Sequence, residues 1–510
     1  MAGKRKWSFT ALAMMTSLSL MLGACSKSNS NAEVSSEGTS PSGSQAASNA
    51  KPEETYELTM SYILFGGSAS DADLVAKEVS KITKEKINTT VKLLPISVAA
   101  YTQQVNLMLT GNEKLDIVGL FPPMNYPGLV SKESLIPMDE LLEKYGQGIK
   151  EAMGSEILKA SQINGQTYAI ASSRPYSQNY GITMRKDLVE KYQFDLTKIK
   201  TWTDLEPIFQ TIKDKEPGVY PLVKPGPFGI VDAIMFSKFD YLGGNGIGGL
   251  VSANNDNQLV DLYGTKDYSD TAAMVRKWYQ AGYMQKDIAT SQDTGGSLLK
   301  AGKAFSMITN LTDDTGPNQR EAGQPMVNVI LTEPITNVLD VTVFMDGIAK
   351  NSKNPEKAMQ FLNLMYTDKD VQNMMKFGIE GKHYVKKGDF IAKPEGVQDV
   401  GYMGPPYSGN AYLESQWEGS DPQLLEKSKK RDESSYKSKG LGFMFDESAV
   451  KSESAAVTNV INQYGPALNV GAIDPEKALP EMLAKLKDAG ADKVITEKQN
   501  QFDAFQQANP

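Results

Sequence analysis

Apolar and polar positions beyond residue 55 alternate between strand-like and helix-like spacing. Positions 56–65 follow a period of two and lead into glycines, which predicts a strand that ends in a loop. Apolar residues then recur on one helical face from Leu74 to Ile82, and Asp71 stands before them as an N-terminal cap. The pattern continues with a strand at 91–96, a helix at 101–110 and a strand at 115–121. This order predicts a parallel sheet covered by helices, with ligands bound where the strands end.

Similar patterns predict the later elements. Positions 163–170 predict a hairpin that turns at Asn164 and Gly165. Asn354 and Asp474 each begin a helix start signal, with a cap, a proline at the first helical position and an acid in the first turn. The glycines of 244–249 match the dinucleotide-binding spacing, but no helix can follow them, so we expect a surface loop. Other predicted elements are an extended segment at 180–184, a helix that Thr201 begins, helices at 268–281 and 296–301, a strand at 304–308 and a last helix to residue 505.

The N-terminal residues have the pattern of a secretory signal. A basic patch at 4–6 precedes a mostly apolar stretch at 9–22, which is too short to span a membrane comfortably. Small residues then precede Cys25, the only cysteine in 510 residues. This stretch resembles the lipobox of bacterial lipoproteins, in which that cysteine carries diacylglycerol. We therefore expect residues 1–24 to be a signal peptide and Cys25 to be the lipid attachment site; a buried thiol is the weaker alternative.

The segment after Cys25 is expected to be a flexible linker. Residues 26–54 carry almost no large apolar side chain, so they cannot bury enough surface to become ordered. Removal of the signal peptide takes away three cationic side chains, and the formal net charge changes from −8 to −11. An acidic chain without a dominant basic cluster argues against binding to nucleic acid.

The chain offers few residues for catalysis or metal binding. One histidine, His383, and one cysteine cannot form the usual zinc sites, and no Gly-x-Ser-x-Gly motif is present, so we expect no metal and no cofactor. A carboxylate pair for glycoside cleavage stays open, because 61 acidic residues always offer some pair. Aromatic residues follow several predicted strand ends, and their flat rings can stack on sugar rings. Core packing explains each ring on its own, but as a group we expect a few to line a cleft.

Several segments in a fixed order resemble a known family. In their order and spacing they are similar to family 1 extracellular solute-binding lipoproteins of ABC importers, in the larger branch of that family. The resemblance extends over nearly the whole chain. The segments are 163–170, 180–188, 201–205, 278–287, 301–305, 347–355 and the ending from 442–446 through Gln501.

The resemblance implies a fold and a domain organisation. It implies an α/β, two-lobe fold of the type II periplasmic-binding-protein kind, with hinge crossings, arranged as in maltose-binding protein. The first lobe would contain 56–174 and 345–384, and the second lobe 175–344 and 385–510. In such proteins the ligand lies between lobes that close by hinge rotation. Some relatives have a calcium loop after the helix that Thr201 begins, but 213–218 lacks the alternating oxygen ligands that calcium requires.

The resemblance also implies loops that contact the ligand. Carried over by position, these loops are 65–71, 121–126, 309–312 and 443–445, and four residues that flank the predicted crossings are added to them. The expected ligand-binding residues are Phe65, Asp71, Phe121, Tyr126, Arg174, Tyr176, Asn310, Asp346, Glu380, Phe443 and Phe445.

The leading hypothesis is a receptor that binds and does not catalyse. It would be a monomer, anchored by lipid on the extracellular face of the cell membrane, that delivers a carbohydrate, expected to be an oligosaccharide, to the permease subunits of an ABC transporter. The alternative from another class is a surface-anchored glycoside hydrolase or lyase that uses paired carboxylates in the same cleft. A third reading is an adhesin or signalling lipoprotein without a transport partner.

Overall fold

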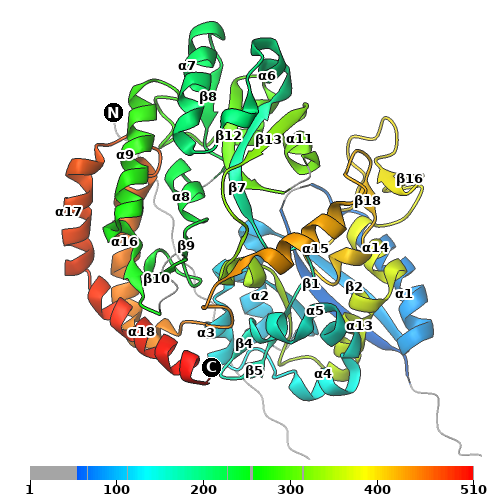
Figure 1. Ribbon diagram of the computed structural model, residues 1–510. Coiled ribbons are helices and arrows are strands. Elements are labelled where there is room, and N and C mark those ends of the chain that lie inside the picture. Colours follow the sequence, from blue (N-terminus) through cyan, green and yellow to red (C-terminus); the bar gives the residue numbers. More distant parts are fainter. Residues whose placement is uncertain are drawn as a thin grey trace, which may run out of the picture. The chain divides into compact units, whose positions relative to one another are not determined.

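Figure 1 shows a computed structural model, which describes residues 54–65, 67–111, 113–226, 228–252, 257–312 and 315–508. The predicted signal peptide, Cys25 and the linker up to residue 53 lie outside the described residues, so they stay predictions. Within these ranges, no helix combines the length and the apolar character that crossing a membrane requires.

The first large sheet has five strands in the order β2-β1-β3-β15-β6. β1 pairs in parallel with β2 and with β3, and its register to β2 extends from Tyr56 opposite Thr89 to Leu64 opposite Ser97. β15 returns from far along the chain and is antiparallel to β3 and β6. The predicted parallel β-α-β-α-β unit is confirmed. The strands are β1 Tyr56–Leu64, β2 Thr89–Ser97, β3 Ile117–Leu120, β6 Ala169–Ala171 and β15 Met345–Ile348.

Helices α1, α2 and α13 pack on this sheet, and its core combines residues between 58 and 176 with residues between 341 and 402. Two details of the predicted first helix are wrong. Leu74 is 38% exposed, because the buried face of α1 instead carries Ala72, Val75, Ala76 and Val79. The Asp71 side chain does not cap the helix, since it contacts Lys382 and His383. The helices of this part are α1 Ala72–Ile87, α2 Val98–Thr110, α3 Tyr126–Ser131, α4 Asp139–Tyr145, α5 Gln147–Lys159, α13 Pro355–Thr367 and α14 Lys369–Phe377.

The second large sheet has four strands in the order β13-β7-β12-β8. β7 lies between two antiparallel partners, and almost its whole length is buried. The hydrophobic core on this second sheet combines residues between 182 and 308 with residues between 450 and 494. The strands are β7 Asn179–Arg185, β8 Tyr220–Val223, β12 Ala304–Leu311 and β13 Met326–Ile330. The two cores are consistent with two lobes, but the lobe boundaries stay a prediction.

The helices around the second sheet include the predicted ones. Asn354 and Asp474 both accept hydrogen bonds from backbone N–H groups of the helices that they precede, as expected of caps. The helix after Thr201 begins as a 3-10 turn, η3 Trp202–Leu205, before α7. The helices are α6 Lys186–Tyr192, α7 Glu206–Lys215, α8 Ile230–Met235, α9 Lys266–Gln280, α10 Gly295–Lys300, α11 Gly316–Ala322, α12 Val338–Thr342, α15 Leu424–Ser434, α16 Lys451–Leu468, α17 Pro475–Asp488 and α18 Ala491–Ala508.

Small sheets complete the fold. The predicted hairpin turns at Asn164 and Gly165, which both have positive φ, so it is confirmed. The prediction of a surface loop at the glycines is wrong beyond Gly246, because Gly248 and Gly249 lie in the mostly buried strand β10. The strands are β4 Gln162–Ile163, β5 Gln166–Thr167, β9 Phe239–Asp240, β10 Ile247–Val251, β11 Val260–Asp261, β14 Ile335–Thr336, β16 Val385–Lys387, β17 Phe390–Ala392, β18 Gln416–Trp417 and β19 Tyr436–Lys437.

The C-terminal helix is fixed to the second half of the chain by a buried lysine. Lys498 on α18 is 1% exposed, and its ammonium group donates to the carbonyl of Tyr241 at 3.2 Å. Helix α18 (red in Figure 1) packs on β10, and the Phe445 ring lies 5.5 Å from the Lys498 nitrogen. Burial lowers the pKa of Lys498 to about 8, and the Asp240 carboxylate opposes that shift.

Replacement of this lysine should change how stability depends on pH. The folded state binds the Lys498 proton more weakly than the unfolded chain, so wild-type stability should rise as pH increases from about 8 towards the pKa of an unfolded lysine. Between pH 7 and 9.5 the free energy of unfolding of the wild type should rise by about 2 kcal/mol relative to that of Lys498→Met.

Urea unfolding at several pH values measures this difference, and Lys493→Met on the exposed side of α18 is the matched control. A difference between wild type and Lys498→Met that does not vary with pH would show that Lys498 titrates normally.

Candidate ligand-binding site

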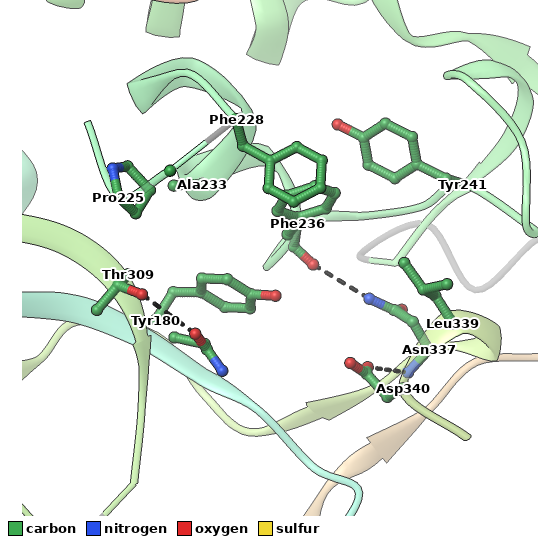
Figure 2. A pocket seen from close by; sticks show the side chains of 12 residues that line it. Tyr180, Pro225, Phe228, Ala233, Phe236, Tyr241, Thr309, Asn337, Leu339 and Asp340 are labelled. Carbon is green, nitrogen blue, oxygen red and sulfur yellow. Dashed lines mark hydrogen bonds between the residues drawn. The ribbon is translucent and has the colours of Figure 1, made fainter. Parts of the chain in front are cut away.

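A cavity of about 330 Å³ opens between helix α8, with the loop before it, and the ends of strands of the second sheet (Figure 2). β7 contributes Tyr180 and β12 contributes Asn310, and these two residues are opposite each other in the strand register. The described lining residues are Tyr180, Pro225, Gly226, Phe228, Ala233, Phe236, Tyr241, Thr309, Asn310, Asn337, Leu339 and Asp340.

Aromatic rings form much of the wall. Phe236 lies at the centre, with its ring 5.2 Å from that of Phe228, 5.1 Å from that of Tyr241 and 6.3 Å from that of Tyr180. Phe228 is 51% exposed, although it is a large apolar side chain. Exposed rings beside a cavity offer flat apolar surfaces, which suits ligands that stack.

Polar groups lie on the opposite side of the cavity from Phe228. Asn337 donates from its side-chain nitrogen to the Phe236 carbonyl at 3.1 Å, which fixes the orientation of the amide. Its Oδ1 is buried and has no partner among the described residues. The Asp340 carboxylate accepts a hydrogen bond from the Asn337 backbone N–H at 2.8 Å, and burial raises the pKa of Asp340 to about 7. The cavity therefore contains acceptors that a ligand with donor groups would satisfy.

A second, much smaller cavity of about 20 Å³ lies at the ends of β3 and β15 in the first sheet. Asp346 lines it and is 3% exposed, and the Ser408 hydroxyl donates to its carboxylate. Burial raises the pKa of Asp346 to about 7. Aromatic rings lie here too, since Phe344 is 5.0 Å from Tyr407 and 5.8 Å from Phe65 between ring centres.

Arg174 connects the residues of the two cavities. This arginine is 8% exposed and follows β6 at the crossing from the first sheet to the second. Its guanidinium group donates to the backbone carbonyl of Asp340, which lines the larger cavity. It also lies 5.2 Å from the ring centre of Tyr407, which lines the smaller one. The two cavities are therefore neighbours, bridged by a single side chain.

The crossing itself is held by hydrogen bonds to the segment around α15. The backbone N–H groups of Tyr176 and Ser177 both donate to the Asp432 carboxylate, at 3.1 and 2.9 Å. Ser173 and Gln178 form isolated bridges to Asn410 and Ile335. These contacts position Arg174 from both sides.

The sequence-predicted site residues lie in several places. Asn310 lines the larger cavity, Asp346 lines the smaller one, Phe65 contacts Phe344 beside it, and Arg174 joins the two. Phe121, Tyr126, Tyr176 and Phe443 are buried among core residues, Phe445 contacts Lys498, Asp71 contacts Lys382 and His383, and Glu380 pairs with Lys386. The role of each of these residues in binding stays a prediction.

The sequence did not single out several residues of the cavities. Phe228, Asn337 and Asp340 were missed, as was Phe344. Phe236, Tyr241 and Tyr407 belong to the aromatic residues beyond predicted strand ends, so that signal did point to this region. For Phe228 a weak signal exists in the sequence, since it follows Pro-Gly-Pro at 225–227. In the described part of the chain, no group of three or more His, Cys, Asp or Glu side chains could hold a metal ion.

Family models identify the class of this protein. Residues 77–380 match the bacterial extracellular solute-binding protein family, and residues 439–507 match a domain of unknown function, DUF3502. The chain belongs to the bacterial extracellular solute-binding protein family, which confirms the predicted family.

Particular relatives support this assignment. The chain is 29% identical, over 86% of its length and 89% of the relative, to a carbohydrate ABC transporter substrate-binding protein of Streptococcus pneumoniae. It is also 24% identical to the polygalacturonan/rhamnogalacturonan-binding protein YtcQ of Bacillus subtilis, over 70% of this chain and 72% of YtcQ. The fold matches the N-glycan transport solute binding protein NgtS of Streptococcus pneumoniae with a TM-score of 0.81 and 28% identity, over 89% of this chain and 100% of NgtS. The predicted two-lobe binding-protein fold is confirmed.

The buried carboxylate of the smaller cavity gives a prediction for stability. The folded state holds the Asp346 proton more tightly than the unfolded chain, so ionisation of Asp346 should cost stability as pH rises from about 4 to above 7. Between pH 5 and pH 8 the free energy of unfolding of Asp346→Asn should therefore rise by on the order of 2 kcal/mol relative to that of the wild type.

Chemical unfolding of both proteins across this pH range gives the measurement. The exposed Asp73 of α1, changed to Asn, is the control for loss of a carboxylate. A constant difference between Asp346→Asn and wild type would contradict the raised pKa.

Proposed function

We propose that this protein is a lipid-anchored extracellular receptor that binds an oligosaccharide between two lobes and delivers it to the permease of an ABC importer. The observation that carries the proposal is the larger cavity, in which aromatic rings face unsatisfied polar atoms. Sugars present apolar ring faces and hydroxyl edges, and this combination matches such a lining. NgtS, the relative with a TM-score of 0.81, also has structures in complex with Man1GlcNAc and Man5GlcNAc.

The smaller cavity supports a ligand longer than one sugar unit. In the structure Phe344 packs against the core of the first sheet, and Tyr407 lines the cavity at the strand ends of that sheet. Phe228 and Phe236 line the cavity at the second sheet. Arg174 contacts residues of both cavities, so a chain of a few sugar units bound at one would reach the other. A ligand that contacts both lobes favours the state in which they are close, which is the condition for ligand-driven closure.

Comparison with NgtS is consistent with such a movement. The TM-score is 0.81 for one NgtS structure, but 0.73 and 0.71 for the NgtS complexes with Man1GlcNAc and Man5GlcNAc. Sequence identity is nearly the same in all three cases, at 28%, 27% and 27%. We infer that the lobes of this chain are arranged less like those of the two saccharide complexes than like those of the first NgtS structure, and that they close on the ligand.

The protein is proposed to leave its ligand chemically unchanged. The two carboxylates with raised pKa values, Asp340 and Asp346, lie in different cavities, and each has a hydrogen-bond partner in the chain. The family to which the chain belongs is one of binding proteins. Chromatography of an oligosaccharide mixture after long incubation with the protein should show no new products; shorter sugars would identify a hydrolase or lyase.

Oligosaccharide binding should be visible as a shift in thermal unfolding, since a ligand that binds only the folded state raises the melting temperature. Phe228→Ala should lower the affinity by roughly tenfold or more, because it removes an exposed ring from the cavity wall. Leu107→Ala removes an exposed apolar side chain from α2 and is the matched control. If peptides or ions shift the transition and no sugar does, the proposed substrate class is wrong.

Lipid anchoring is tested separately at the only cysteine. Cys25→Ser should move the protein from the membrane fraction to the soluble fraction and should abolish incorporation of labelled fatty acid, since two or more acyl chains are required for stable attachment. Ser26→Ala, which leaves the thiol in place, is the control. A Cys25→Ser protein that stays with the membrane would disprove the anchor.

A further inference from the structure

We propose that residues 439–507, the segment that matches a domain of unknown function, position the aromatic wall of the larger cavity, and that Asn469 is the residue through which this segment sets the Phe228 ring. This inference rests on the proposed function, since it takes the cavity to be the ligand site. None of the described lining residues belongs to 439–507, so the segment has to act through the elements that carry the wall. Two buried polar side chains make that connection, Asn469 and Lys498.

Asn469 holds the start of helix α8. It directly follows α16 and is 8% exposed. Its side-chain nitrogen donates to the Asp232 carboxylate at 2.7 Å, and its backbone carbonyl accepts from the Val231 N–H at 2.9 Å. The other oxygen of the Asp232 carboxylate accepts from the Gly229 N–H at 2.8 Å. Because the Tyr268 hydroxyl donates to Asn469 Oδ1, the asparagine amide is fixed at both of its ends.

The backbone that Asn469 holds carries an exposed ring. A Cβ atom at Gly229 would lie 2.6 Å from the Asn469 carbonyl oxygen, so the chain in front of α8 packs directly on Asn469. Phe228 precedes this glycine and is 51% exposed. Its ring stands edge to face with that of Phe236, which directly follows α8 (Figure 2). The position of the Phe228 ring therefore depends on the backbone at 229–232 more than on burial of the ring itself.

Lys498 makes a second connection to the same wall. Its ammonium group donates to the carbonyls of Tyr241 at 3.2 Å and of Ile247 at 3.5 Å. The Tyr241 ring lies 5.1 Å from that of Phe236, on the cavity wall. One segment of the chain thus holds the backbone on both sides of Phe236. Satisfied buried polar contacts are directional, so they fix an orientation that apolar packing alone would leave adjustable.

A ring that is already in its binding orientation does not have to be ordered when the ligand arrives. Loss of the Asn469 amide would release the backbone at 229–232 and leave every ligand-contacting side chain in place. The affinity should then fall because the Phe228 ring has to be ordered during binding.

A double-mutant cycle with Phe228 tests this by calorimetric titration of the intact protein. The ligand is whichever of maltopentaose, cellopentaose, mannopentaose, chitopentaose and an oligogalacturonate binds most tightly to the wild type. Asn469→Ala should weaken its binding about fivefold, the cost of ordering one ring on binding. In a Phe228→Ala background the same substitution should change the affinity by less than about twofold, because the ring that Asn469 positions is absent.

The matched control is Tyr464→Phe. It removes another hydrogen bond of the same C-terminal segment, from Tyr464 on α16 to Glu481 on α17, away from α8. This variant should leave the affinity unchanged in both backgrounds. Hydrogen–deuterium exchange without ligand should be faster at 229–236 in Asn469→Ala than in the wild type, and unchanged there in Tyr464→Phe.

A second variant takes the place of Asn469→Ala in the cycle if that protein does not fold. Asn469→Asp keeps the size of the side chain and the acceptor for Tyr268, but it cannot donate to an ionised Asp232. Burial raises the pKa of Asp232 to about 6, so the titrations at pH 8 find this carboxyl ionised. The expected result is the same, a loss of affinity that depends on the presence of Phe228.

The outcomes separate this inference from the proposed function. If saccharides bind and the substitution of Asn469 leaves the affinity or the exchange at 229–236 unchanged, the inference is wrong and the receptor function stands. If the loss of affinity is equal in the wild-type and Phe228→Ala backgrounds, or if Tyr464→Phe causes the same loss, Asn469 acts through general stability and the inference is wrong. If none of these oligosaccharides binds, the proposed function fails, and the inference fails with it.

Discussion

The contacts of Arg174 are the interaction on which the candidate site depends. A buried guanidinium group needs hydrogen-bond acceptors inside the protein, and the Nη atoms of Arg174 donate to the backbone carbonyls of Pro175 and Asp340. The guanidinium carbon also lies 5.4 Å and 5.2 Å from the ring centres of Tyr176 and Tyr407. Because one of these carbonyls belongs to Asp340, the crossing between the sheets is tied to the wall of the larger cavity. The segment that joins the two sheets therefore also holds the wall of the candidate site.

The larger cavity needs support from distant parts of the chain. Two residues of its aromatic wall, Phe236 and Tyr241, directly follow α8 and β9. Lys498 of the C-terminal helix donates a hydrogen bond to the carbonyl of Tyr241. The segment that matches a domain of unknown function contains Lys498 and also Phe502, which packs in one cluster with Leu242, Leu250 and Val338. That segment braces the site without lining it, since the described lining residues end at Asp340.

Sequence patterns predicted the elements whose causes are local. The alternation in β1, the cap at Asn354 and the turn at Asn164 and Gly165 depend on neighbouring residues, so they could be read directly. The contact of Asp71 with His383 could not be predicted, because the two residues are 312 positions apart in the sequence. The larger cavity could not be predicted for the same reason, because Tyr180, Phe228 and Asn337 meet only through the packing of the second sheet. Asn310 was expected at the site because the family resemblance implied a loop at 309–312, and Asp346 because it flanks a predicted crossing; each lies beside a cavity.

The central claim is that one oligosaccharide contacts both cavities at once, on either side of Arg174. A crystal structure of the protein with a bound oligosaccharide of several sugar units tests it most directly. The account predicts sugar rings against Phe228 and Phe236 and, in the same molecule, against Phe344 or Tyr407. A ligand that contacts only one cavity, or that lies elsewhere on the surface, would contradict it.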